Sequence, residues 1–240
     1  MRQSLLIARR ELYAYIRSPL GAIIIAGALM LDAILLYWSG LSAGKQSAEV
    51  LQLFFYNTSG VTMAAALFLS MRLLAEERQT GTMTLLNTAP VRDSEIVAGK
   101  FLAAFGMITV MTALTFYMPL LIYVTGKVSV GHILVGYVGL LFLGAAATAI
   151  ALFASSLARS TVVAVIVGAA LLAVIILQWA VARAVDPPLN KFLAAIALHH
   201  ENFRPFMNGI LQLSGIAYYV AITYFFLLCA TKVQEARRWR

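Results

Sequence analysis

Residues that could bind a nucleotide or act as a nucleophile are poorly placed in this sequence. A phosphate-binding loop follows the pattern GxxxxGK[ST], and its nearest counterpart, Ala98-Gly99-Lys100-Phe101, lacks both the upstream glycine and the hydroxyl residue. The serine pattern GxSxG is absent, and a single cysteine cannot supply a cluster of metal-binding thiolates. We therefore expect a chain that is not an enzyme and that binds no cofactor itself.

The segment His199-His200-Glu201 has residue types suited to a metal site but lacks the spacing. In the zinc-binding HExxH pattern the two histidines share one helix face, whereas adjacent side chains on a helix diverge by about 100°. No second histidine follows Glu201. We expect these three residues to form a helix end or an outer-surface contact, with no metal bound.

Asp32 is the one acidic residue that lies within an apolar stretch long enough to span a membrane. Ionisable residues at such positions are candidates for function, because burying their charge in lipid is costly. A structural role, with the carboxyl protonated or hydrated near the outer interface, is an equal alternative. An intramembrane aspartic protease would need a second acid in a span, and the other nine acids lie outside the apolar stretches.

Composition explains why chemically active residues are so few. The chain has 240 residues, of which 62% are hydrophobic and 12% charged, and its mean hydropathy is +0.87. A soluble domain is about 45–50% apolar and about 25% charged, and a chain of this length cannot bury so large an apolar excess. These values exclude a soluble enzyme, a disordered protein and a disulfide-stapled secreted domain.

Six apolar stretches are long enough to cross a membrane as helices, which takes about 20 residues. They cover Leu20–Leu41, Leu53–Leu74, Phe101–Thr125, Ile133–Leu157, Thr161–Ala182 and Ile210–Thr231. None shows the alternation of polar and apolar residues that is typical of a β-barrel strand. The sequence thus predicts an all-α polytopic membrane protein that forms one domain over residues 1–240.

The basic residues indicate on which side of the membrane the two termini lie. With six spans, thirteen of the eighteen lysines and arginines fall on the side of the termini and five on the other side. Cytoplasmic segments carry the excess of Lys and Arg, so we expect both termini to be cytoplasmic. The net charge of +8 then reflects topology and contact with lipid headgroups, and we expect no nucleic-acid partner.

The first 18 residues are predicted to form a helix that lies in the membrane interface. Its apolar stripe consists of Leu5, Ala8, Leu12, Tyr15 and Ile16. Pro19 is expected to end this helix before the first span.

The segment 75–100 is predicted to form a helical hairpin between the second and third spans. Gly81 is expected to end its first helix and Thr82 to cap a short second one, which a proline stops. Asp93 or Ser94 is expected to cap the third span. The apolar residues of the short helix would form an exposed edge ringed by charge, which favours either a partner site or a connector buried among headgroups. The residues of interest are Glu76, Glu77, Gly81, Thr82, Met83, Leu85, Leu86 and Pro90.

On the opposite side of the membrane, the segment 184–209 carries the two histidines and Glu201. Its apolar part, Leu193–Leu198, is too short to span. We expect it to form a re-entrant or interfacial helix near the outer surface.

Four stretches of the sequence carry a recognisable pattern. They are ARRELYAYIRSPLG (8–21), MRLLAEERQTGTMTLLNTAPVRDSEIVAGKFLAA (71–104), LFASSL (152–157), and HHENF (199–203) paired with a final ARRW (236–239). The second is the most specific, since EE, GT, LL, P, EI and GK occur in that order and spacing. Over its whole length the chain resembles the permease subunits of ABC-2-type transporters, with the gliding-motility (Gld-type) branch as the best match.

This resemblance implies an N-terminal elbow helix and six spans, in a complex of the bacterial inner membrane. Two permeases, identical or related, would pair with two cytoplasmic ABC ATPase subunits that bind the ATP and Mg. In that family the first cytoplasmic loop holds a coupling helix that sits in a groove of the ATPase. The resemblance therefore assigns ATPase coupling to the residues of interest in 75–100.

Two functions fit these expectations. One is an ATP-driven permease that exports an amphipathic or unknown cargo, because the uncharged third to fifth spans do not suit a wide aqueous path for a charged solute. The other is a mechanical transmitter or scaffold that passes the motion to an outer-side accessory protein through 184–209, in motility or secretion machinery, without moving cargo.

Overall fold

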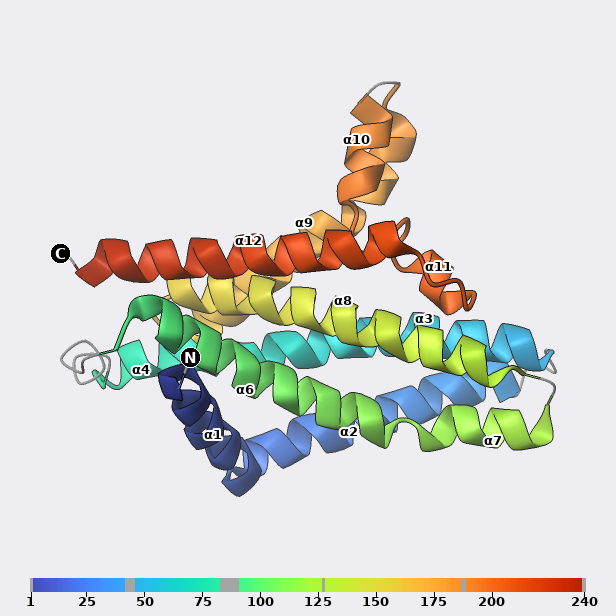
Figure 1. Ribbon diagram of the computed structural model, residues 1–240, viewed down its shortest axis with the longest axis horizontal. Helices are drawn as coiled ribbons and strands as arrows, with labels where there is room; N and C mark the ends of the chain where they lie inside the picture. Colours follow the sequence, from blue (N-terminus) through green and yellow to red (C-terminus); the bar gives the residue numbers. More distant parts are fainter. Residues whose placement is uncertain (1, 42–45, 83–90, 127, 187–188, 239–240) are drawn as a thin grey trace.

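Long helices dominate the structure (Figure 1). The computed structural model describes residues 2–41, 46–82, 91–126, 128–186 and 189–238, and within these ranges the elements are helices and no strand occurs. Six helices are long and apolar enough to cross a membrane, as predicted. They cover Pro19–Gly40, Ser47–Gln79, Asp93–Val124, Val130–Leu157, Thr161–Ala184 and Leu213–Arg237. The all-α polytopic fold class is confirmed.

The spans are built from the helices labelled in Figure 1, with α1 (Arg2–Arg17) in front of the first. The first span combines α2 (Pro19–Leu36) with a π-helical turn at Tyr37–Leu41. The second combines α3 (Ser47–Ser70) with α4 (Arg72–Gln79), and the third α6 (Asp93–Leu114) with α7 (Tyr117–Thr125). The last three are α8 (Val130–Leu157), α9 (Thr161–Ala184) and α12 (Leu213–Arg238), with α10 (Leu189–Ile196) and α11 (Arg204–Met207) between the final two.

The third span starts well before the predicted Phe101, because its first two turns are polar and an apolar window cannot detect them. Arg92 is the N-cap residue, and its backbone N–H donates to Glu95 Oε2 at 3.3 Å. The prediction that Asp93 or Ser94 caps this helix is therefore wrong, since both lie inside it. The second span likewise continues through a charged turn, α4, before it ends.

α3 and α8 form the core of the bundle, whereas α2, α9 and α12 expose most of their surface. Glycines on α8 allow its neighbours to approach closely. A Cβ atom at Gly136 would lie 2.2 Å from the ring of Phe55 on α3, and one at Gly144 would lie 2.8 Å from Cγ2 of Ile108 on α6. Small residues serve the same purpose in other packed membrane helices.

α1 packs along α6 and ends as predicted before Pro19 (Figure 1). The face it presents to α6 differs from the predicted stripe, since Leu5 and Ile16 are 65% and 69% exposed. Glu11 lies on the packed side instead. Exposed apolar residues suit a helix that lies in the membrane interface, and this position of α1 stays a prediction.

Both termini lie at the same end of the bundle, together with α4 and the start of α6 (Figure 1). This arrangement agrees with an even number of spans. α10 and the C-terminal part of α9 project from the bundle side by side (Figure 1). The predicted short helix in 184–209 is present as α10, and it begins and ends slightly before the expected Leu193–Leu198.

Candidate functional site

The second span is interrupted at Met71, where a side chain from α8 enters its hydrogen-bond ladder. Ser155 Oγ accepts hydrogen bonds from the backbone N–H groups of Leu74 and Ala75, at 3.2 and 3.1 Å, and donates one to the Met71 carbonyl at 3.0 Å. In an unbroken helix the Ala75 N–H would bond the Met71 carbonyl directly. The serine hydroxyl therefore bridges two groups that would otherwise pair, which is a known cause of helix irregularity.

α4 ends in a left-handed turn at Gly81, whose φ is +74°. Thr80 Oγ1 donates to the Glu76 carbonyl at 2.9 Å, and Thr82 Oγ1 donates to the Glu77 carbonyl at 3.3 Å. The Glu76 carbonyl also accepts the Thr80 backbone N–H at 2.9 Å, and both hydroxyls thus bond carbonyls of the last turn of α4. The predicted break at Gly81 is confirmed, and the Thr82 hydroxyl bonds back to α4.

The short coupling helix predicted after Thr82 lies outside the residues that the structure describes. This applies to Met83, Leu85, Leu86 and Pro90. Their exposed apolar edge stays a prediction from the sequence.

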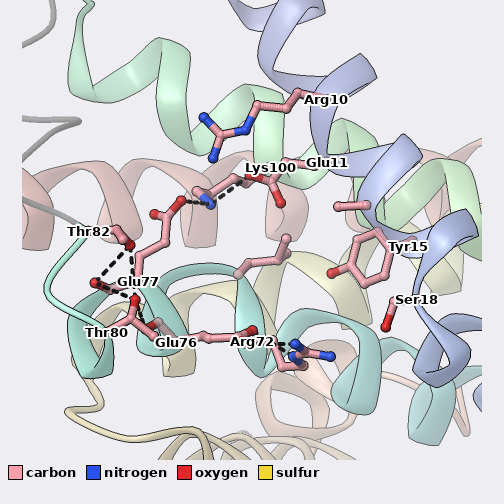
Figure 2. Close-up of a pocket in the computed structure, with 12 residues that line it drawn as sticks. Arg10, Glu11, Tyr15, Ser18, Arg72, Glu76, Glu77, Thr80, Thr82 and Lys100 are labelled. Atoms are coloured by element: carbon pink, nitrogen blue, oxygen red, sulfur yellow. Dashed lines mark hydrogen bonds and ion pairs between the residues drawn. The ribbon is translucent and has the colours of Figure 1, made fainter.

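A buried lysine joins three helices beside this turn (Figure 2). Lys100 of α6 is 1% exposed, and its Nζ lies 2.8 Å from Glu77 Oε1 on α4 and 3.2 Å from Glu11 Oε1 on α1. Both carboxylates are largely buried. Removing one member of a buried ion pair leaves an uncompensated charge, at a cost of about 3–5 kcal/mol. We call Glu11, Glu77 and Lys100 the lysine triad.

A pocket of about 250 Å³ adjoins the lysine triad, between α1, α4 and the start of α6 (Figure 2). On one wall, Arg72 holds Glu76 through two hydrogen bonds of 2.6 Å. On another, Tyr15 donates its hydroxyl to the Leu69 carbonyl at 2.6 Å, and burial raises the pKa of this phenol, which therefore stays neutral. Glu76 thus lines the pocket wall, whereas Glu77 reaches the buried lysine.

Two arginines cover the C-terminal end of α8 at the same end of the bundle. Arg78 of α4 donates to the carbonyls of Ser156 and Ala158, the latter at 3.0 Å, and to Gln234 Oε1 on α12 at 2.6 Å. Arg237 of α12 donates to the Leu157 carbonyl at 2.8 Å. Cations at a helix C-terminus satisfy its last carbonyls and its negative dipole end. Arg78 therefore ties α4 to α8 and α12.

His199 borders a second pocket, of about 370 Å³, between α2, α3 and α9. Its Nε2 lies 2.6 Å from Ser59 Oγ, and Tyr56 packs edge-on against its ring with 5.2 Å between centroids. Burial and the neighbouring His200 lower the pKa of His199 to about 4. The imidazole is therefore neutral at physiological pH.

The two adjacent histidines contact different helices. His200 stacks on Trp179 of α9, with 4.4 Å between ring centroids, whereas His199 contacts α3. Glu201 is exposed. No group of three His, Cys, Asp or Glu side chains close enough to hold a metal ion occurs in the described part of the chain.

Asp32 lies in the interior of the bundle and is not part of the lysine triad. It is 1% exposed and faces Thr58 of α3. The structure thus separates the sequence candidates into three places: the α4 turn, the pocket at His199 and the interior around Asp32.

Three residues of the site, Lys100, Glu11 and Ser155, were not predicted from the sequence. Lys100 was taken as the boundary of a span, although a lysine within a helix that enters the bundle has to be buried with partner charges. That rule was the available signal for Lys100. The identity of its partners depends on how α1 and α4 pack, which no local pattern contains.

The fold is that of a multi-pass helical membrane protein, and the lysine triad forms a cluster of ion pairs at one end of its spans. The family model of the ABC-2 family transporter protein matches residues 6–231, and the chain belongs to this family. The chain is thus a membrane component of an ABC transporter in the bacterial inner membrane, and it associates with a cytoplasmic ABC ATPase. The match is to the family as a whole and does not distinguish among its branches, so the gliding-motility branch stays a prediction. A comparison with curated proteins found no match.

Proposed function

We propose that this chain is the permease subunit through which a cytoplasmic ATPase drives export of an amphipathic cargo, with residues 75–100 as the coupling segment. The lysine triad is the observation that carries the proposal. It pairs Glu77, near the beginning of the coupling segment, with Lys100 at its end, and it joins both to Glu11 of α1. A displacement of that segment by the ATPase would therefore act on three helices together.

Movement at α4 would also reach the core of the bundle. Ser155 and the carbonyls bonded by Arg78 connect α4 to α8, which is one of the two most buried spans. Packed helices switch between discrete arrangements and do not deform continuously, so small shifts at such contacts are amplified. We infer that the ATPase cycle switches the packing of α4 and α8.

The orientation that suits this function puts the lysine triad in the cytoplasm. Both termini lie at that end, and the excess of basic residues belongs to the same side. A second permease, identical or related, and two ATPase subunits would complete the transporter. The exposed apolar faces of α2, α9 and α12 provide surface for the second permease and for lipid.

The pocket at His199 is the part of the bundle that best suits an amphipathic cargo. Leu31, Leu35 and Ile176 supply an apolar wall, whereas Asn57 and the Ser59–His199 pair supply a polar edge. A neutral imidazole and a hydroxyl suit an uncharged polar group. The cargo class proposed here is a lipid-like molecule with such a group next to its apolar part.

The experiment that tests coupling compares two double variants of the full-length permease in nanodiscs. Leu85→Ala with Leu86→Ala removes the predicted apolar anchors, and loss of an anchor worth about 2 kcal/mol weakens ATPase binding about 30-fold. Leu211→Ala with Leu213→Ala, at exposed positions just before and at the first residue of α12, is the matched control and should bind normally. Unchanged ATPase affinity and turnover in the first variant would show that 75–100 is only a connector.

The alternative function, a mechanical transmitter without cargo, has one structural observation in its favour. α10 projects from the bundle beside the end of α9, and so offers a contact for an outer-side accessory protein in motility or secretion machinery (Figure 1). Deletion of residues 189–196 distinguishes the two. It should abolish function in a transmitter and leave cargo-stimulated ATP turnover intact in an exporter.

A further inference from the structure

Asp32 and two threonines form an unsatisfied polar group in the interior of the spans. Neither carboxylate oxygen of Asp32 has a hydrogen-bond partner among the described residues. The hydroxyl of Thr58 lies close enough to Asp32, from α3, to interact with its carboxyl, although no hydrogen bond of normal geometry is formed, and the hydroxyl of Thr62, one helical turn further along α3, is likewise without a hydrogen bond. All three side chains are buried. Four oxygen atoms therefore lie in the bundle core without a partner in the described part of the chain.

Other buried threonines of the bundle behave differently. Thr112 donates to the Ile108 carbonyl at 2.8 Å, and Thr148 donates to the Gly144 carbonyl at 2.7 Å. A threonine within a helix commonly satisfies its hydroxyl in this way, on the carbonyl four residues earlier. Thr58 and Thr62 do not make this bond. Their oxygens are therefore oriented for some other contact.

No positive side chain in the described part of the chain neutralises Asp32. Among the described residues of α1, α3 and α6, which pack against α2, none places a charge close enough to act on this carboxyl. Tyr137 of α8 is the titratable group within electrostatic reach, and its hydroxyl is already paired with Thr115 Oγ1 at 3.1 Å. A bare carboxylate in a low-dielectric interior is strongly disfavoured. The described residues therefore leave the carboxyl of Asp32 without a counter-charge, which a bound cation or proton would supply.

We propose that Asp32, Thr58 and Thr62 form a binding site for a single monovalent cation, taken up as Na⁺ or as a proton. Carboxylate and hydroxyl oxygens are the ligands that small hard cations prefer. A proton instead turns Asp32 into a hydrogen-bond donor toward a threonine hydroxyl. Because Asp32 belongs to the first span and the threonines to the second, the cation stabilises the packing of α2 against α3 and opposes any transport step that separates them.

The test measures thermal unfolding of the full-length permease in nanodiscs while Na⁺ replaces choline at constant ionic strength, and separately while the pH is lowered. For a Na⁺ site the midpoint rises with Na⁺ concentration in the wild type, because a ligand that binds only the folded state stabilises it. This rise is lost in Asp32→Asn and in Thr58→Val with Thr62→Val. For a proton site the midpoint is insensitive to Na⁺, and the wild type gains stability over Asp32→Asn as the pH falls.

Two further measurements keep the test decisive. Thr112→Val with Thr148→Val is the matched control, and it should keep the response of the wild type because those hydroxyls bond their own helix. If Asp32→Asn does not fold, the infrared carbonyl band of a protonated carboxyl in the wild type, and its dependence on Na⁺ and pH, reports the same site. The proposal is overturned if the wild type and Asp32→Asn respond identically to both Na⁺ and pH.

Discussion

Lys100 Nζ of the third span and Glu77 Oε1 at the end of the second lie 2.8 Å apart, with the lysine almost completely buried. The same ammonium group meets Glu11 of the N-terminal helix at 3.2 Å. This one side chain thereby links α1, α4 and α6 at the end of the bundle where both termini lie. Its removal provides the most direct test of that role.

Lys100→Met should lower the free energy of unfolding by about 3–5 kcal/mol, because it leaves two buried carboxylates without a counter-charge. The measurement is thermal or detergent-induced unfolding of the purified permease. Lys232→Met is the matched control. Lys232 is 74% exposed and pairs with Glu235 on the surface, so its replacement should change stability by less than about 1 kcal/mol.

Neutralising the whole lysine triad should restore most of this loss. Glu11→Met and Glu77→Met, added to Lys100→Met, remove the uncompensated charges, and buried ion pairs are often replaceable by well-packed hydrophobic residues of similar volume. If Lys100→Met is no more destabilising than Lys232→Met, the triad does not hold these helices together.

Ser155→Ala should cost about 0.5–1.5 kcal/mol, because it removes the hydrogen bonds between α8 and the second span, whereas the Ala75 N–H and the Met71 carbonyl can then pair with each other. Ser156→Ala is a neighbouring control, because the Ser156 hydroxyl bonds only the Phe153 carbonyl of its own helix, at 2.7 Å. Unfolding midpoints of the two variants decide the matter. Equal losses would mean that the contact between α8 and the second span adds nothing.

Acidification should destabilise the permease through His199. Its pKa is about 4 in the folded protein against an ordinary 6.5, so the native state binds fewer protons than the unfolded chain between these values. The contribution is fully present above about pH 6.5 and is lost progressively as the pH falls toward 4, by about 3 kcal/mol in total. His199→Gln should flatten this part of the pH profile of unfolding. His200→Gln removes the smaller of the two causes of the lowered His199 pKa, so it should flatten the profile less. A wild-type profile that matches that of His199→Gln would contradict the prediction.

Single cysteines should report the topology. With Cys229 replaced, an impermeant thiol reagent added outside the cell should label cysteines at Ser47 and Asn190 and should not label those at Gln79 and Arg238. The basic residues and the shared end of the two termini support this orientation. Labelling at Gln79 from outside would mean that the permease has the opposite orientation in the membrane. The lysine triad would then lie on the outer side, where a cytoplasmic ATPase cannot reach it.

The number and order of the spans could be predicted from the sequence, because hydropathy over about 20 residues is a local property. The breaks before Pro19 and at Gly81 could be predicted for the same reason, since each depends on the backbone preference of one residue. The apolar windows failed where a helix continues through charged turns, as at α4 and the start of α6. There the charges are satisfied by distant residues, and the helix carries no apolar signal.

The candidate site was only partly predictable. Glu76 and Glu77 were identified as a pair, yet the structure directs Glu76 to Arg72 and Glu77 to Lys100. The role of Glu11 was missed because an acid on an otherwise basic and apolar helix gives no local indication of its partner. Such contacts arise from tertiary packing, which brings together residues far apart in the chain.

The hydroxyl of Ser155 on α8 forms part of the hydrogen-bond ladder of the second span, so the course of this span depends on another helix. Its interruption at Met71 involves neither proline nor glycine, and it exists only while α8 is alongside. The interruption at Met71 therefore depends on the second span and α8 together. A synthetic peptide of residues 47–79 in a bilayer would have no reason to break there, and the joint would be created only when the permease assembles.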